Sequence, residues 1–107
     1  MSFNIIDRIR WLGQSGFLLY LNEKLIVIDP YETSISALAD VILITHPHWD
    51  HLSLNDIEKF KFSKTKIFAE PQSAKIIGEQ ADILQAGDEL VIDGITIKAV
   101  RAYNNLK

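Results

Sequence analysis

Short runs of apolar residues, separated by turn residues, set the pattern along the chain. Runs of this length, rich in branched and aromatic side chains, are typical of strands rather than helices. The expected strands cover residues 3–11, 17–21, 25–29, 41–45 and 66–69, with a hairpin over 89–102 around Asp93-Gly94. A short loop at 22–24 joins the second strand to the third. Pro30 is expected to end the third strand, because proline has no backbone donor for a sheet.

Two short helices are predicted between these strands. Ser53 is a suitable N-cap for a helix that ends near Phe60, and Asp56 follows near the positive end of that helix. Pro71 suits the first turn of a second helix, over about 72–78. The elements together predict an α/β fold, with a mixed, largely antiparallel sheet that carries helices on one face.

Two of the expected strands are apolar without interruption, at residues 25–28 (LIVI) and 41–44 (VILI). A strand of this kind is buried on both faces, whereas a strand with one face in water alternates apolar and polar residues. The two helices can cover one face of the sheet. Few elements remain to cover the other, so we expect a partner subunit or a continuation of the chain to cover it.

Composition narrows the class of protein. With 107 residues, of which 48% are hydrophobic and 23% charged, the chain has the balance of one globular domain over residues 1–107. It contains no cysteine, which excludes disulfides and thiolate ligands and fits a reducing cytoplasm, so we expect a cytoplasmic protein. The net charge of −3 gives no general electrostatic argument for nucleic acid. No apolar run is long enough to span a bilayer, and the charged N-terminus does not resemble a signal peptide.

The three histidines of the chain all fall within residues 46–51, in the sequence HPHWDH directly after an apolar strand. Neutral imidazole is the commonest metal ligand in proteins. Residues two apart on an extended segment point the same way, so His46 and His48 can converge on one ion. Asp50 and His51 follow where the chain turns, and can reach a second ion close by. The alternative is that these histidines are ordinary polar residues at a strand end, which becomes harder to sustain with three of them and an aspartate together.

The segment VILITHPHWDHL resembles the metal-binding signature of the metallo-β-lactamase superfamily, H-x-H-x-D-H after a hydrophobic strand. The resemblance extends upstream through WLGQSGFLLYLNEKLIVIDPY and downstream through GDELVIDGITIKAVRAYN, and is strongest to its lactonase-like and uncharacterised metal-dependent hydrolases. It implies half of an αββα sandwich, with residues 1–107 as the N-terminal half. The implied activity is hydrolysis of an ester, lactone, amide or phosphodiester by metal-bound hydroxide.

Carried over by residue, the resemblance implies that His46 and His48 hold the first ion, and that Asp50 and His51 hold the second. Asp50 would also handle protons as the catalytic residue, and Asp29 would position the loop from close by. The implied cofactor is Zn²⁺, with Mn²⁺ or iron as alternatives and up to two ions, since nitrogen and oxygen ligands suit all three metals.

The chain also departs from the family pattern. It has no histidine after His51, and Gln14 stands where some relatives have a histidine. Family members complete the site from a second half of the chain, so one copy of this sequence cannot build the whole site. Three interpretations follow: the first half of a hydrolase, a natural half-size protein that pairs with itself, or an inactive module for binding or assembly. All three readings favour association, and we expect a homodimer or higher oligomer through the uncovered sheet face.

Four lysines over residues 59–66 are interleaved with two phenylalanines, in the sequence KFKFSKTK. Such a stretch can contact RNA. The simpler interpretation is a solvated helix end, in which lysines complement the helix dipole and Phe60 and Phe62 pack inward.

Overall fold

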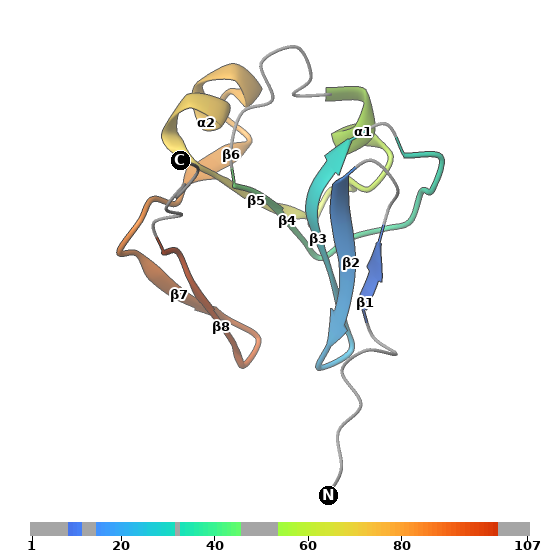
Figure 1. Cartoon of the computed structure of the whole chain (residues 1–107), viewed down its shortest axis with the longest axis horizontal. Helices are drawn as coiled ribbons and strands as arrows, with labels where there is room; N and C mark the ends of the chain where they lie inside the picture. Colours follow the sequence, from blue (N-terminus) through green and yellow to red (C-terminus); the bar gives the residue numbers. More distant parts are fainter. Residues whose placement is uncertain (1–8, 12–14, 32, 46–53, 101–107) are drawn as a thin grey trace, which may run out of the picture.

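The computed structural model describes residues 9–11, 15–31, 33–45 and 54–100, and its main feature is a six-stranded sheet (Figure 1). Its strands lie side by side in the order in which they occur in the sequence. They are β1 (Ile9–Trp11), β2 (Ser15–Leu21), β3 (Lys24–Tyr31), β4 (Val41–Ile44), β5 (Lys66–Ala69) and β6 (Ala81–Ile83). Two short helices, α1 (Leu54–Glu58) and α2 (Pro71–Ile77), lie between the later strands, and a separate hairpin follows, formed by β7 (Glu89–Ile92) and β8 (Ile95–Lys98).

The large sheet is mixed, as predicted. The strands β1, β2 and β3 pair antiparallel, and β3, β4, β5 and β6 pair parallel. Three of the five strand pairs in this sheet are therefore parallel, which is more than the largely antiparallel sheet that the sequence suggested, and one of the three involves β6, which was not predicted. It has three residues, and its one large apolar side chain, Ile83, is exposed. A strand this short gives no alternating pattern to recognise.

The third strand continues past the point where Pro30 was expected to end it, so that prediction was wrong. Ser15 pairs with Tyr31 and Phe17 pairs with Ile28, so β3 holds one more residue than β2 over this stretch. The extra residue makes a β-bulge, in which Asp29 adopts a left-handed backbone with φ 47°. Bulges are among the few places in a sheet where proline is accepted, since a ladder hydrogen bond is already missing there.

One face of the sheet packs against both helices, as predicted. Alternate residues of the central strands point to this face, and they meet apolar side chains from the two helices and from the turn after α1. The buried members of this core are Val27, Ala39, Ile42, Ile44, Ile57, Phe60, Ile67, Ala69, Ala74 and Ile77. Phe60 is fully buried. It therefore packs inward, as expected if the lysine-rich stretch 59–66 is a solvated helix end.

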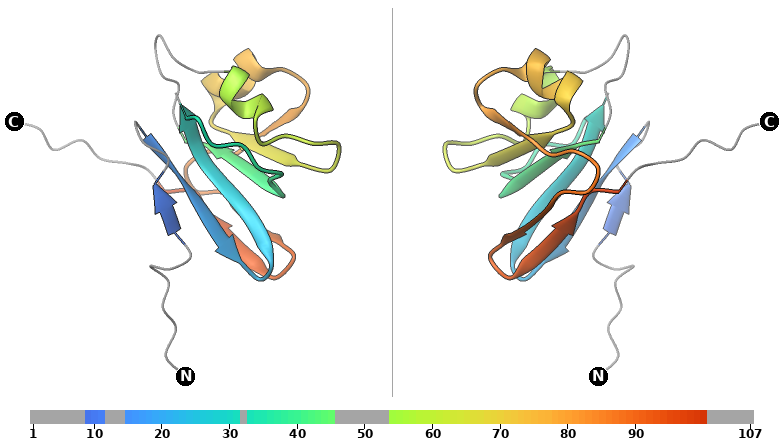
Figure 2. Two further views of the ribbon diagram at one scale, coloured as in Figure 1. Left: turned by 90° about the vertical axis from the view of Figure 1, so that its right-hand side faces the viewer. Right: turned by 90° about the vertical axis from the view of Figure 1, so that its left-hand side faces the viewer.

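The hairpin of β7 and β8 lies on the side of the sheet away from the helices (Figures 1 and 2). Its Ile92 and Ile95 are buried against Ile26 and Val41 of the sheet. The runs at 25–28 and 41–44 thus pack on both faces, as predicted, although Leu25, Ile28 and Leu43 are only partly buried. The expectation that the chain has too little left to cover the second face needs correction, because its own hairpin covers part of that face.

Two tight turns meet where the hairpin crosses the sheet. The turns Asn22-Glu23 and Asp93-Gly94 each place two consecutive residues at positive φ, which is the conformation that joins antiparallel strands through two residues. A Cβ placed on Gly94 would lie 3.4 Å from the side-chain nitrogen of Asn22, and Lys24 forms an ion pair with Asp93 at 3.7 Å. The contact fixes the hairpin tip against the turn between β2 and β3.

In the described part of the chain, no helix has both the length and the apolar character needed to cross a membrane.

Candidate metal centre

The carboxyl ends of four parallel strands meet at one edge of the sheet. β3, β4, β5 and β6 all run toward this edge, which brings Asp29, Thr45, Glu70 and Leu84 to the same side of the molecule. Sites in α/β folds form at such edges, because the loops that leave the strands converge there. The histidine-containing segment, residues 46–51, begins directly after Thr45.

Asp29 holds the end of β4 at this edge. One carboxylate oxygen accepts a hydrogen bond from the backbone N–H of Thr45 at 2.8 Å, and the other accepts from its hydroxyl at 2.5 Å. The bulge described above allows this, because its left-handed backbone interrupts the regular alternation of β3 at Asp29. The structure therefore has Asp29 bonded to the residue that immediately precedes His46, in accord with the loop-positioning role expected for it.

The predicted ligands themselves, His46, His48, Asp50 and His51, lie outside the described residues. Within the described ranges, no three histidine, aspartate or glutamate side chains are grouped so that they could hold a metal ion. The candidate centre therefore rests on the sequence of residues 46–51 and on the described residues that lie on either side of it.

A second carboxylate lies on the other side of this segment. Asp56, in α1, is 3% exposed, and its Oδ1 accepts from the backbone N–H of Thr33 at 3.2 Å and from Lys59 Nζ at 3.0 Å. Lys59 also donates to the backbone carbonyl of Thr33. We call Thr33, Asp56 and Lys59 the Asp56 network. It pairs a buried charge with a cation and a backbone donor, as the burial of a carboxylate requires.

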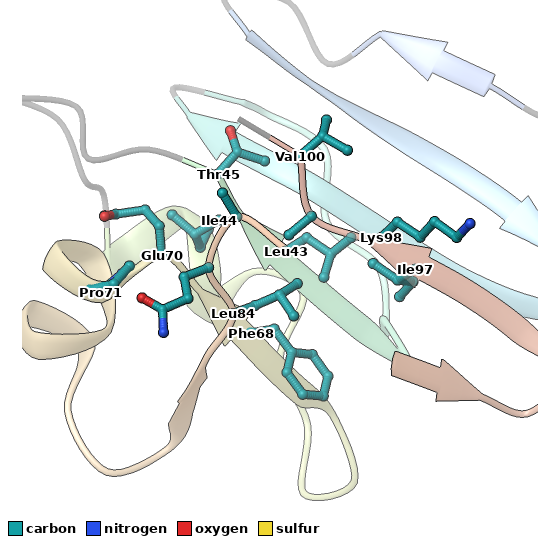
Figure 3. Close-up of a pocket in the computed structure, with 13 residues that line it drawn as sticks. Leu43, Ile44, Thr45, Phe68, Glu70, Pro71, Leu84, Ile97, Lys98 and Val100 are labelled. Atoms are coloured by element: carbon teal, nitrogen blue, oxygen red, sulfur yellow. The ribbon is translucent and has the colours of Figure 1, made fainter. Parts of the chain in front are cut away.

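A pocket of about 430 Å³ opens at the same edge, between β4, β5 and the end of β8 (Figure 3). Its walls are mainly apolar, with Leu43, Phe68, Leu84 and Ile97 among them. Figure 3 shows Thr45 and Glu70 toward one end of the pocket and Ile97 and Lys98 toward the other. The pocket therefore extends from the strand end that leads into residues 46–51 across the face that the hairpin only partly covers.

Glu70 has a structural role at the rim of this pocket. Its carboxylate accepts from the backbone N–H groups of Gln72 and Ser73, at 3.0 and 2.5 Å, and from the Ser73 hydroxyl at 2.5 Å. It is the N-cap of α2, and Pro71 follows as the first helical residue, as predicted. These bonds engage the Glu70 carboxylate with its own helix.

Sequence reasoning missed three features of this edge: the N-cap at Glu70, the link between Thr45 and Asp29, and the burial of Asp56. The Asp-x-x-Lys spacing at 56 and 59 gave a local signal, since side chains three apart on a helix are neighbours. Nothing in the spacing indicated that Thr33, far away in the sequence, would hydrogen-bond to both members of that pair.

Comparison with known proteins places this arrangement in a family. The family model described as the beta-lactamase superfamily domain matches residues 8–107. A relative from Methanoculleus marisnigri, named a UPF0173 metal-dependent hydrolase, is 34% identical over 101 residues, which are 92% of this chain and 43% of the relative. A relative from Saccharolobus solfataricus with the same family name is 28% identical, over 92% of this chain and 51% of its own. The chain spans about half the length of the curated relatives it matches.

Solved structures agree with the predicted fold. A candidate metal-dependent hydrolase from Parabacteroides distasonis superposes with a TM-score of 0.78 at 33% identity, over 91% of this chain and 46% of its own. A candidate zinc-dependent hydrolase of the metallo-β-lactamase superfamily from Thermotoga maritima has a TM-score of 0.55 at 22% identity, over 91% and 38%, and shows the fold alone. The mixed sheet with helices on one face is thus part of an αββα sandwich, and the chain belongs to the beta-lactamase superfamily.

Proposed function

We propose that residues 1–107 form the N-terminal half of a metal-dependent hydrolase, and that residues 46–51 provide its first metal ligands. The observation that carries this proposal is the H-x-H-x-D-H sequence directly after Thr45, which Asp29 holds at the carboxyl edge of the parallel strands. The names of the relatives, which are those of metal-dependent hydrolases, support the same activity.

The chemistry of the donor set fits a divalent cation. His46, His48 and His51 offer neutral nitrogens and Asp50 offers a carboxylate, a combination that suits zinc, with manganese and iron as alternatives. A bound ion there supplies Lewis acidity to a carbonyl or phosphoryl oxygen and makes water more acidic. In this proposal Asp50 would also take up and return a proton during hydrolysis, and Asp29 holds the strand end that leads into the ligands.

The substrate class in this proposal is an ester, lactone, amide or phosphodiester. The pocket beside Thr45 supports substrates that carry an apolar group next to the bond to be broken, because Leu43, Phe68 and Ile97 give it apolar walls. A second function is supported by Leu43 and Phe68, which are only partly buried on the sheet face opposite the helices and can pack against a partner. In that case the chain is a catalytically inactive half-domain that acts as an oligomeric module for binding or assembly.

One experiment separates the two functions. The purified chain is dialysed, its metal content is measured, and hydrolysis of a generic ester and of a bis-aryl phosphodiester is followed with and without Zn²⁺ or Mn²⁺. The hydrolase proposal expects metal to bind at residues 46–51, and His48→Ala to abolish that binding together with any metal-dependent turnover. Lys64→Ala, in an exposed turn, is the matched control and keeps the bound metal. Metal-free protein with no turnover under either metal supports the inactive module instead.

A further inference from the structure

Residues near the end of β3 and just after it hold the chain on both sides of the candidate ligand segment. Asp29 binds Thr45, which directly precedes His46. Shortly after Asp29, the backbone of Thr33 binds Asp56 and Lys59 of the helix region that follows His51. One short stretch of chain therefore contacts the residue before the ligand segment and the helix after it.

The contact with Asp56 matters because α1 cannot fix its own position. This helix has five residues, and helices so short are unstable in isolation. Its placement must come from tertiary contacts, which are the burial of Ile57 and Phe60 and the Asp56 network. Apolar packing holds the helix against the sheet, but it has little directional preference. The hydrogen bonds of Asp56 are directional, and they fix the helix relative to Thr33.

Backbone hydrogen bonds strengthen the same connection. Ala37 N–H donates to the carbonyl of Lys59 at 3.2 Å, and Ala39 N–H donates to the carbonyl of Phe60 at 2.8 Å. The Thr33 hydroxyl accepts from the N–H of Ile35 at 3.0 Å, which shapes the loop that carries these donors. The loop between β3 and β4 is thus bonded at Thr33, Ala37 and Ala39 to α1 and to the residues that follow it.

We propose that Asp56 is a positioning residue for the metal ligands, acting through α1 on the side of the segment where Asp50 and His51 occur in the sequence. This inference rests on the proposed function, because it assumes that residues 46–51 bind metal. Residues that orient metal ligands without binding the metal themselves typically lower the metal affinity 10- to 100-fold when they are removed. Asp56 would orient the ligands without touching the ion, because it fixes the position of α1, the helix that follows the last ligand in the sequence.

The chain offers a matched control on the same helix. Glu58 and Lys61 form an ion pair with the same spacing as Asp56 and Lys59, at 3.2 Å, but the Glu58 side chain is 61% exposed. Among the described residues, the hydrogen bonds of this second pair run within the pair and from Lys61 to Gln80, and not to the loop between β3 and β4. Glu58→Gln therefore removes a comparable charge from α1 and leaves the connection to Thr33 in place.

The test measures Zn²⁺ binding to the full chain by calorimetry and by NMR of the histidine rings. All three histidines lie in residues 46–51, so their ring signals report on this segment alone. The wild-type rings are expected to shift with Zn²⁺. Asp56→Asn is expected to need about tenfold more Zn²⁺ for the same shift, and Glu58→Gln is expected to match the wild type. Lys59→Met, which removes the cation and keeps the apolar stem, replaces Asp56→Asn if that variant does not fold.

The outcomes separate the two proposals. If zinc shifts the wild-type rings and a folded Asp56→Asn or Lys59→Met binds with unchanged affinity, the positioning role of Asp56 is refuted and metal binding stands. If zinc does not shift the wild-type rings, the proposed metal site fails, and the role of Asp56 fails with it. A variant that melts at a lower temperature but binds zinc normally when folded shows that the network only stabilises the fold.

Discussion

Among the described glycines, Gly16 has the least space for a side chain. It lies in β2 opposite the bulge, with φ +96°. A Cβ added there would lie 2.4 Å from the carbonyl oxygen of Asp29 and 2.7 Å from that of Ile28. Both contacts are with backbone atoms, which cannot rotate away as a flexible side chain could. Gly16→Ala must therefore move the strand that carries Asp29.

The cost has two parts. An L-residue held at an unfavourable positive φ costs about 1–3 kcal/mol. Overpacking that forces a backbone shift costs a further ~1–3 kcal/mol. Because a small domain has a total stability of only about 5–15 kcal/mol, the sum removes a large share of it. With roughly 4–8 °C lost per kcal/mol, Gly16→Ala is expected to lower the melting temperature by about 10 °C or more.

The assay is thermal unfolding followed by circular dichroism, with Gly87→Ala as the control. Gly87 has a nearly identical φ of +98°, but no atom within 4 Å of an added Cβ, so its alanine variant has the strain without the clash. Gly16→Ala should therefore melt well below Gly87→Ala. Equal melting temperatures would refute the argument that Gly16 is required by the close approach of Asp29 and Ile28.

Three further predictions test the site, the core and the sheet face. Asp29→Asn keeps a residue that tolerates a left-handed backbone but removes the carboxylate charge that strengthens the hydrogen bond from Thr45. Hydrogen exchange at the Thr45 amide should accelerate about tenfold for each 1.4 kcal/mol lost, and unchanged exchange would contradict this. Phe60→Ala empties a fully buried position and should cost about 3–5 kcal/mol in urea unfolding, whereas Val91→Ala, at a side chain that is 64% exposed, should stay within ~0.5 kcal/mol. Sedimentation at micromolar concentration should show a homodimer or higher oligomer, because Leu43 and Phe68 are only partly buried on the face opposite the helices; a compact monomer would count against that prediction.

Local signals predicted most of the elements correctly. The continuous runs at 25–28 and 41–44 identified the two central strands, and Pro71 and Asp93-Gly94 marked the start of α2 and the turn of the hairpin. These succeeded because each depends on neighbouring residues: burial on both faces excludes polar side chains from a strand, and a two-residue turn needs residues that accept positive φ.

The features that escaped prediction depend on distant residues. The third strand continues through Pro30 because Gly16 on the neighbouring strand allows a bulge there. Asp56 is buried because Thr33 and Lys59 meet it in the folded chain. At the candidate site, sequence and structure contribute different parts: the ligands are identified from the sequence of residues 46–51, and the groups that hold the chain beside them are identified from the structure.

The position of β3 in the sheet has a consequence for the order of folding. β3 pairs antiparallel with β2 and parallel with β4. Its pairing with β2 closes a loop of two residues, and hairpins of this kind form within about 1–10 μs. Pairing with β4 must first close a much longer loop, at a greater cost in chain entropy. The β2–β3 hairpin can therefore nucleate the sheet, and the carboxyl edge that carries the candidate site would assemble only as β4 and the later strands add to it.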